Sequence, residues 1–335
     1  MKWEASEQLD FGLDLRVFKD RLSFSFDYFD KKTKGLLVST VPPYETGVSS
    51  VVVNGGNVSN KGMEFEFGWR ERINDFSYSA TANLSTLKNK VIYLDPSISR
   101  IDGASFHTNP GITAFEKGYP VWYMRGYQLK DIDNETGDPI FVDQLTVDTN
   151  GDGKPDAADG VIDDNDKVML GKGFPDFTYG ITLNASYKGF DLTVFGTGAE
   201  GNSIFNCLTR IDRPRANRLK IFYNDRWNTS NTDASKPRPN CNNEDKYWIS
   251  SDLVMDGSYF KIKQIQLGYT FPKNLIKKLY MTNLRIYASF DDWFVFTNYP
   301  GFDPEASAGS TTLLGVDKGS YPNSKKAVIG INVAF

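Results

Sequence analysis

The stretch that decides the fold is Leu9-Asp10-Phe11-Gly12-Leu13-Asp14-Leu15-Arg16-Val17, in which every odd position is apolar and every even position is polar or small. Successive side chains of a β-strand point to opposite faces, so this alternation predicts a strand with one apolar and one polar face. The pattern restarts in residues 22–28, after a turn at residues 19–21. It recurs in residues 63–70, 76–84, 177–185, 190–194, 265–271, 284–290 and 327–335.

The connections between these segments fall into two classes that alternate along the chain. With a low-contrast strand at residues 119–131, the sequence predicts about ten strands. Outer-membrane barrels alternate short periplasmic turns with long extracellular loops, whereas a soluble sandwich has no reason to do so. We therefore predict an all-β fold, the antiparallel portion of a transmembrane β-barrel. The short links are residues 19–21, 73–75 and 188–189, and the long ones are residues 38–58, 86–118, 132–175, 198–256 and 298–324.

Composition agrees with this interpretation and argues against a helical membrane protein and a nucleic-acid-binding protein. Of the 335 residues, 40% are hydrophobic and 14% aromatic, but no apolar run approaches the length of about 18 residues that a membrane helix needs. The 42 acidic and 38 basic residues are spread along the chain. Because a nucleic-acid binder shows a clustered basic surface, we expect no nucleic-acid partner.

Residues that could carry catalysis are scarce. His107 is the only histidine and lies in a stretch rich in Ser, Asn and Pro, so we interpret it as an ordinary loop residue. Asp291 and Asp292 are the one tempting acidic pair. Neighbouring strand residues point to opposite faces, which makes them one lumen-facing acid and one barrel-wall residue. We therefore expect that the protein is not an enzyme.

The two cysteines, Cys207 and Cys241, fall in one long polar segment without a strand pattern. In an oxidising compartment they could form a disulfide that closes this loop. Two unrelated thiols are the alternative, because a sequence cannot show whether two cysteines meet.

One segment has the spacing of a calcium loop. Ca²⁺ is held by oxygen atoms at positions 1, 3, 5, 7 and 12 of such a loop, with a glycine at position 6. Gly153 takes position 6, and the oxygen positions are taken by Asp148, Asn150, Asp152, the carbonyl of Lys154, and Asp159. The alternative is a solvated acidic turn, since Asp, Asn and Gly dominate turns. We predict a structural Ca²⁺ that orders an extracellular loop.

Several further stretches are similar, in the same order, to those of the SusC/RagA-like family of TonB-dependent outer-membrane transporters. They are Lys2-Trp3-Glu4, Asp27-Tyr28-Phe29, Gly56-Asn57-Val58-Ser59-Asn60-Lys61-Gly62-Met63-Glu64, Gly173-Phe174-Pro175-Asp176-Phe177-Thr178-Tyr179-Gly180, Asp256-Gly257-Ser258-Tyr259-Phe260-Lys261, Leu267-Gly268-Tyr269-Thr270-Phe271-Pro272, Gly301-Phe302-Asp303-Pro304-Glu305 and the ending Gly330-Ile331-Asn332-Val333-Ala334-Phe335.

The resemblance implies that residues 1–335 match only the carboxy-terminal strands of a barrel of about 22 strands, without a plug domain or the amino-terminal strands. It implies an importer of large nutrients, either oligosaccharides or peptides, in the lipid of the Gram-negative outer membrane. The implied partners are a SusD-like surface lipoprotein and TonB, which would act through the missing amino-terminal region. A soluble calcium-binding β-sandwich is the alternative.

Overall fold

A single antiparallel sheet forms the body of the molecule in this computed structural model, which describes residues 2–40, 45, 47–49, 51–103, 105–106, 111–208, 219–305 and 310–335. The strands follow the order β1-β2-β3-β4-β12-β13-β16-β17-β19, and β5 also pairs with β3. Their bounds are β1 Ala5–Val17, β2 Leu22–Thr40, β3 Val51–Ile73, β4 Phe76–Thr86, β5 Lys88–Leu94, β12 Phe177–Tyr187, β13 Phe190–Glu200, β16 Tyr259–Thr270, β17 Asn283–Thr297 and β19 Lys326–Ala334.

Tight turns join the strands at one end of this sheet. The turn between β12 and β13 is Lys188-Gly189, with φ values of 45° and 91°. Two positive φ angles are what a type I′ hairpin turn requires, and its twist matches that of the flanking strands. Asn74, between β3 and β4, also has a positive φ of 55°. Short links therefore gather at one end, as the sequence predicts.

The cross-strand register joins the apolar positions into continuous rows. Leu15, Phe24, Phe67, Ala82 and Ile181 lie opposite one another on five consecutive strands. Because side chains alternate between faces, the register places most of the apolar residues on one face and most of the Ser, Thr, Asn, Asp and Glu residues on the other. The predicted division into two faces is confirmed. A neighbouring row reaches the last strand through Leu183, Val194, Ile265, Phe290 and Ala327.

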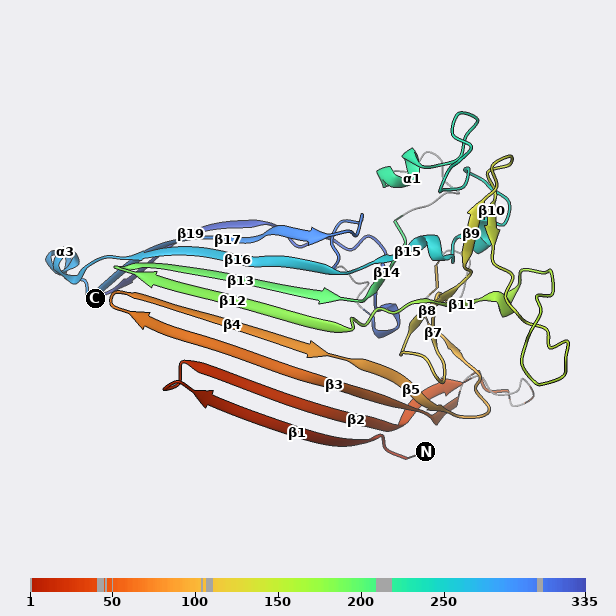
Figure 1. The fold of residues 1–335 in the computed structure, drawn as a ribbon, viewed down its shortest axis with the longest axis horizontal. Helices are drawn as coiled ribbons and strands as arrows, with labels where there is room; N and C mark the ends of the chain where they lie inside the picture. The colour runs from red at the N-terminus through yellow and green to blue at the C-terminus, as the bar shows by residue number, and fades with distance from the viewer. Residues whose placement is uncertain are drawn as a thin grey trace.

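The long connections gather at the opposite end of the strands, where they form a folded cap (Figure 1). We define the cap as the described residues of 95–176, 201–258 and 298–325. Its elements are β6 Ile101–Asp102, β7 Thr113–Phe115, β8 Tyr123–Gly126, β9 Leu129–Ile132, β10 Pro139–Phe141, η2 Asp164–Asp166, β11 Val168–Gly171, β14 Ser203–Asn206, α1 Lys220–Asn224, α2 Glu244–Tyr247, η3 Ser251–Leu253, β15 Val254–Asp256, η5 Thr311–Leu313 and β18 Val316–Asp317.

The end with the tight turns carries little besides them. A single longer link there holds α3 Lys273–Ile276 and η4 Lys277–Leu279, and it lies beside the C-terminus (Figure 1). In the described part of the chain, no helix is both long and apolar enough to cross a membrane.

The cap has an apolar core of its own. Trp248, Tyr247, Phe205, Ile112 and Leu253 are each at most 1% exposed and belong to one buried cluster. These side chains come from segments far apart in the sequence, since Ile112 and Leu253 belong to the same cluster, so the loops fold on one another. The sequence predicts long loops here but not this core.

Two expectations differ from the structure. Residues 119–131 form the short cap strands β8 and β9 instead of a wall strand, because both strands pair only within small separate sheets. The nine other predicted strands are confirmed as neighbours in one continuous sheet. The sandwich alternative is therefore wrong, since it needs two sheets packed face to face.

Candidate functional site

The polar face of the sheet is hollowed beside the tight turns. A cavity of about 580 Å³ there is lined by Arg70, Arg72, Ser79, Asn184 and Thr193, among others. The Thr193 hydroxyl donates to the Asn184 side chain at 2.9 Å. Charged, amide and hydroxyl groups of this kind suit a water-filled lumen.

A cluster of charged side chains, which we call the ion cluster, lies at the cap end of the polar face. Lys261 is only 1% exposed, and its Nζ lies 3.0 Å from Asp303 Oδ1 and 2.5 Å from Glu305 Oε2. Lys263 Nζ lies 2.6 Å from the same Glu305 oxygen. Asn323 donates its backbone amide to Asp303 at 3.0 Å and its side-chain amide to Glu305 at 2.8 Å. Residues 303–305 and 323 are therefore fixed onto strand β16.

These contacts control the ionisation of Glu305. Burial alone would raise the pKa of this carboxyl group, but hydrogen bonds from Lys261 and Lys263 outweigh burial and hold its pKa below the usual range. A charge taken out of water is tolerated only where it is paired and hydrogen-bonded. The cluster meets this condition.

A β-bulge shapes the strands behind the cluster. The register between β16 and β17 shifts between Ile262 and Gln264, and Asp292 on β17 has a φ of 58°. The Asp292 carboxylate lies 3.4 Å from Lys263 Nζ, so it belongs to the ion cluster. The expectation that one of Asp291 and Asp292 is a barrel-wall residue is wrong, because the bulge breaks the alternation of faces there. Asp291 keeps the regular register, opposite Gln264.

A second buried polar network ties the cap segments together. The Asn206 side-chain amide donates to the Tyr299 hydroxyl at 3.2 Å, and this hydroxyl donates to Asp317 Oδ2 at 2.7 Å. All three residues are at most 5% exposed. Burial raises the pKa of Tyr299 far above its usual range, so its hydroxyl stays protonated and able to donate.

A third group of charged side chains in the cap is centred on Asp164. Asp164 lies 2.7 Å from Lys167, 3.3 Å from Arg125 and 3.5 Å from Arg100. Burial would raise the pKa of Asp164, but hydrogen bonds from Lys167 and Arg125 hold it well below its usual range. This carboxylate therefore stays ionised and joins three cations.

The predicted calcium ligands lie close by, in an exposed turn of the cap. Asp148 Oδ2 accepts from the amide of Gly153 at 2.8 Å, and this bond is the main reason why the pKa of Asp148 lies below its usual range. Asn150 and Asp152 each accept from the amide two residues further on, at 2.9 and 2.8 Å. The second of these amides belongs to Lys154, whose carbonyl is the fourth predicted ligand.

The fifth predicted ligand is separated from the other four. A bridge between Val147 and Ala157 closes the turn, and Asp159 lies beyond it, where it accepts from the amide of Val161 at 2.8 Å. Among the described residues, no three acidic, histidine or cysteine side chains are gathered to hold a metal ion. The calcium site stays a prediction.

The cysteines and the histidine add no further site geometry. Cys207 and Cys241 are free thiols, 8% and 6% exposed, in the same apolar cluster of the cap. The possible disulfide between them is not formed in the structure. Burial raises the pKa of each thiol to about 12. His107 lies outside the described residues.

The ion cluster, like the core of the cap, is a feature that the sequence alone did not reveal. Asp303 and Glu305 lie in a stretch, Gly301-Phe302-Asp303-Pro304-Glu305, that the resemblance singles out. Their partner Lys261 is more than forty residues away. The local signal was a pair of lysines, Lys261 and Lys263, in strand β16.

Comparison with known proteins gives one consistent result. Residues 1–284 match the family described as TonB dependent receptor-like, beta-barrel. TonB-dependent receptor P3 of Formosa agariphila is 35% identical over the whole chain, and TonB-dependent receptor SusC of Bacteroides thetaiotaomicron is 27% identical over the whole chain. The chain spans about a third of the length of these relatives, 34% and 32%.

Solved structures agree with the arrangement of the strands. The structure of the RagAB peptide transporter superposes on the whole chain with a TM-score of 0.81 and 24% sequence identity, and the match covers 36% of that chain. The same importer in its open-open state gives a TM-score of 0.80. The sheet and its cap therefore have the fold of part of such a barrel.

Proposed function

This chain belongs to the TonB-dependent receptor-like β-barrel family, and from this membership we propose that it forms part of the wall and the extracellular cap of an importer of large nutrients. Members of the family are outer-membrane proteins. The apolar face of the sheet therefore lies against lipid, and the polar face lines the lumen. The family is one of receptors rather than enzymes.

The single observation that carries the proposal is that the sheet has a polar lumen face and that the cap lies at one end of this face. Groups such as Arg70, Asn184 and Thr193 line the polar face. Oligosaccharides and peptides both present many hydrogen-bonding groups, so a wall of charges, amides and hydroxyls supports cargo of either class. A small ion or an apolar compound would not need such a wall.

Two partners complete the proposed importer. A SusD-like surface lipoprotein would lie over the cap and close the lumen from outside. TonB would energise import, as the names of the relatives suggest. The cap, folded around a core that includes Trp248 and Tyr247, would give such a lid a surface on which to rest.

Growth experiments in the natural host test this proposal. Deleting the gene should abolish growth on one oligosaccharide or peptide mixture as sole nutrient source and leave growth on its monomers unchanged. Deleting TonB should have the same effect. Growth that survives both deletions on every polymeric nutrient would contradict the proposal.

A further inference from the structure

Five lysines on β2, β3 and β5 continue the apolar face of the sheet at its cap end. We call them the lysine rim. One row across these strands is Leu9, Asp30, Lys61 and Lys88, and the next row is Glu7, Lys32, Ser59 and Lys90. The members of the lysine rim are Lys32, Lys34, Lys61, Lys88 and Lys90.

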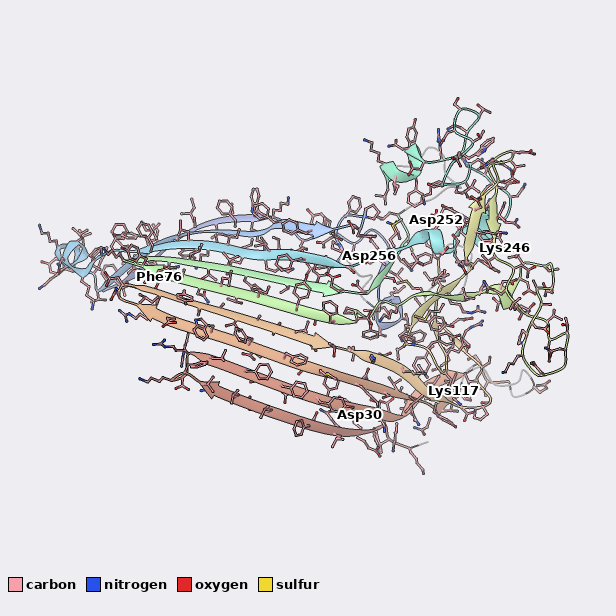
Figure 2. All side chains as sticks on the ribbon, in the orientation of Figure 1. Asp30, Phe76, Lys117, Lys246, Asp252 and Asp256 are labelled. Atoms are coloured by element: carbon pink, nitrogen blue, oxygen red, sulfur yellow. The ribbon has the colours of Figure 1, made fainter. Side chains whose placement is uncertain are left out.

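The lysine rim lies on the lipid face and not on the lumen face. The last apolar row before it is Phe11, Tyr28 and Met63. The register from this row to Lys61 and Lys32 shows no shift, and side chains two residues apart share a face. Asp30, which marks the first lysine row, lies toward the cap in Figure 2, whereas Phe76 lies at the opposite end.

The charge of the rim is not balanced within the chain. Five lysines stand against two carboxylates, Glu7 and Asp30, which leaves an excess of three positive charges. Lys34 pairs with Glu7 at 2.5 Å, and Lys61 pairs with Asp30 at 2.8 Å. Lys32, Lys88 and Lys90 make no ion pair with any described residue. Lys88 and Lys90 are exposed.

The depth of the rim matches the headgroup layer. Each row lies two residues, about 6.7 Å along a strand, beyond the row before it. With the usual strand tilt of about 40°, this is about 5 Å along the membrane normal. The first two lysine rows therefore lie about 5 and 10 Å beyond the last apolar row, outside the hydrocarbon and level with lipid phosphates. Lys34, opposite Ala5, lies one row further.

We propose that the lysine rim binds the phosphorylated headgroups of the lipids that surround the barrel in the outer leaflet. Ammonium groups on flexible stems are suited to phosphate as point charges. Their stems lie against apolar surface while the charged ends reach the headgroup layer. The rim would anchor a shell of bound lipid on the side of the wall formed by β1–β3 and β5. The proposal goes beyond import, because it concerns the outer surface of the wall.

Lipid binding by the purified protein, in the full length in which it occurs, tests this proposal. The probe is fluorescent bisphosphorylated lipid A in mixed micelles, with phosphatidylcholine as the zwitterionic comparison. The variant combines Lys32→Gln, Lys88→Gln and Lys90→Gln, which removes the excess charge but keeps both ion pairs. Lys31→Gln is the matched control, since Lys31 lies opposite Gln8 and Asn60 on the lumen face.

One lysine at a membrane surface changes affinity by about fivefold. We therefore expect the triple variant to bind lipid A at least about tenfold more weakly, and Lys88→Gln alone to bind about fivefold more weakly. Lys31→Gln should bind as the parent does. Folding is checked in every variant by testing whether the unheated barrel resists unfolding by detergent.

Three results would overturn the proposal. The first is a triple variant that is folded and binds within twofold of the parent. The second is an equal loss in Lys31→Gln. The third is displacement of the lipid by inorganic pyrophosphate as completely as by unlabelled lipid A, which would make the rim a site for free anions. Import measured in the triple variant should be unchanged, so failure here is distinct from failure of the proposed function.

Discussion

Lys261 is a charged side chain with 1% exposure that contacts two carboxylates, Asp303 and Glu305. Removing one partner of a buried ion pair leaves the other charge uncompensated, at a cost of about 3–5 kcal/mol. Lys261→Met should therefore lower the free energy of unfolding by about this amount, measured by urea unfolding with tryptophan fluorescence. Lys263→Met, at a site with 24% exposure, should cost clearly less. Equal losses of unfolding free energy in the two variants would contradict the conclusion that Lys261 is the buried charge of the cluster.

The ion cluster also predicts a pH dependence. Glu305 has a pKa below its usual range when folded, so it binds protons less readily in the folded than in the unfolded state. Its stabilisation is fully present above the unfolded pKa of about 4.3 and is lost as pH falls through the lower folded pKa. Hydrogen exchange of residues 301–305 should stay slow, after correction for intrinsic rates, from pH 7 to pH 5 and rise below that range. Glu305→Gln should abolish this change, whereas a rise that begins near neutral pH would point to another group.

The exposed turn around Asp152 yields a prediction about calcium. If Asp148, Asn150, Asp152, Asp159 and the Lys154 carbonyl gather around an ion, titration calorimetry with Ca²⁺ should show saturable heat. Oxygen distances at the bound ion should be about 2.3–2.6 Å. Asp152→Ala should remove this heat. Absence of heat in the parent protein would leave the segment as a turn held by its own side chains.

At the scale of the strand, the alternation of side chains makes the two faces separately testable. Ala82 lies between Phe67 and Ile181 on the apolar face, and its neighbour Thr81 lies on the polar face. Ala82→Arg should cost about 2–4 kcal/mol in a bilayer, as expected for arginine at the midplane. Thr81→Arg should cost little, because the lumen is wet. Unfolding from lipid vesicles in guanidinium measures both, and similar costs would contradict the division of faces.

The sheet was predictable because its signal is local. In a strand such as β12, apolar and polar residues alternate within eleven residues. The tight turn at Lys188-Gly189 separates two such alternating segments in the sequence. Period-two alternation therefore predicted nine wall strands. It failed at residues 119–131, where apolar and polar residues alternate over a short stretch because the strands there are partly buried in the cap. It also failed for the pair Asp291 and Asp292, where a bulge breaks the alternation of faces without any mark in the sequence.

The cap was not predictable because its contacts are distant in sequence. Tyr299 reaches Asn206 across 93 residues, and Lys261 reaches Asp303 across 42. No periodic pattern records such pairs. Polar, irregular segments give the same local signal whether they pack around a core such as Trp248 or remain in solvent.

On the scale of the whole molecule, the sheet has two edges. Among the described residues, β1 pairs only with β2, and β19 pairs only with β17. A barrel in lipid must satisfy every backbone group by closure. We therefore expect further strands to join these edges in the assembled barrel, consistent with relatives about three times as long.

The central claim is that this sheet is a barrel wall with lipid on one face and water on the other. Spin labels placed singly at positions 180–185 of β12, in the full-length protein in lipid vesicles, test it most directly. Collision rates with oxygen, which partitions into lipid, and with a water-soluble nickel complex should alternate with period two. Labels replacing Ile181, Leu183 and Ala185 should favour oxygen, and labels replacing Gly180, Thr182 and Asn184 should favour nickel. Equal access of nickel to both sets would contradict the account.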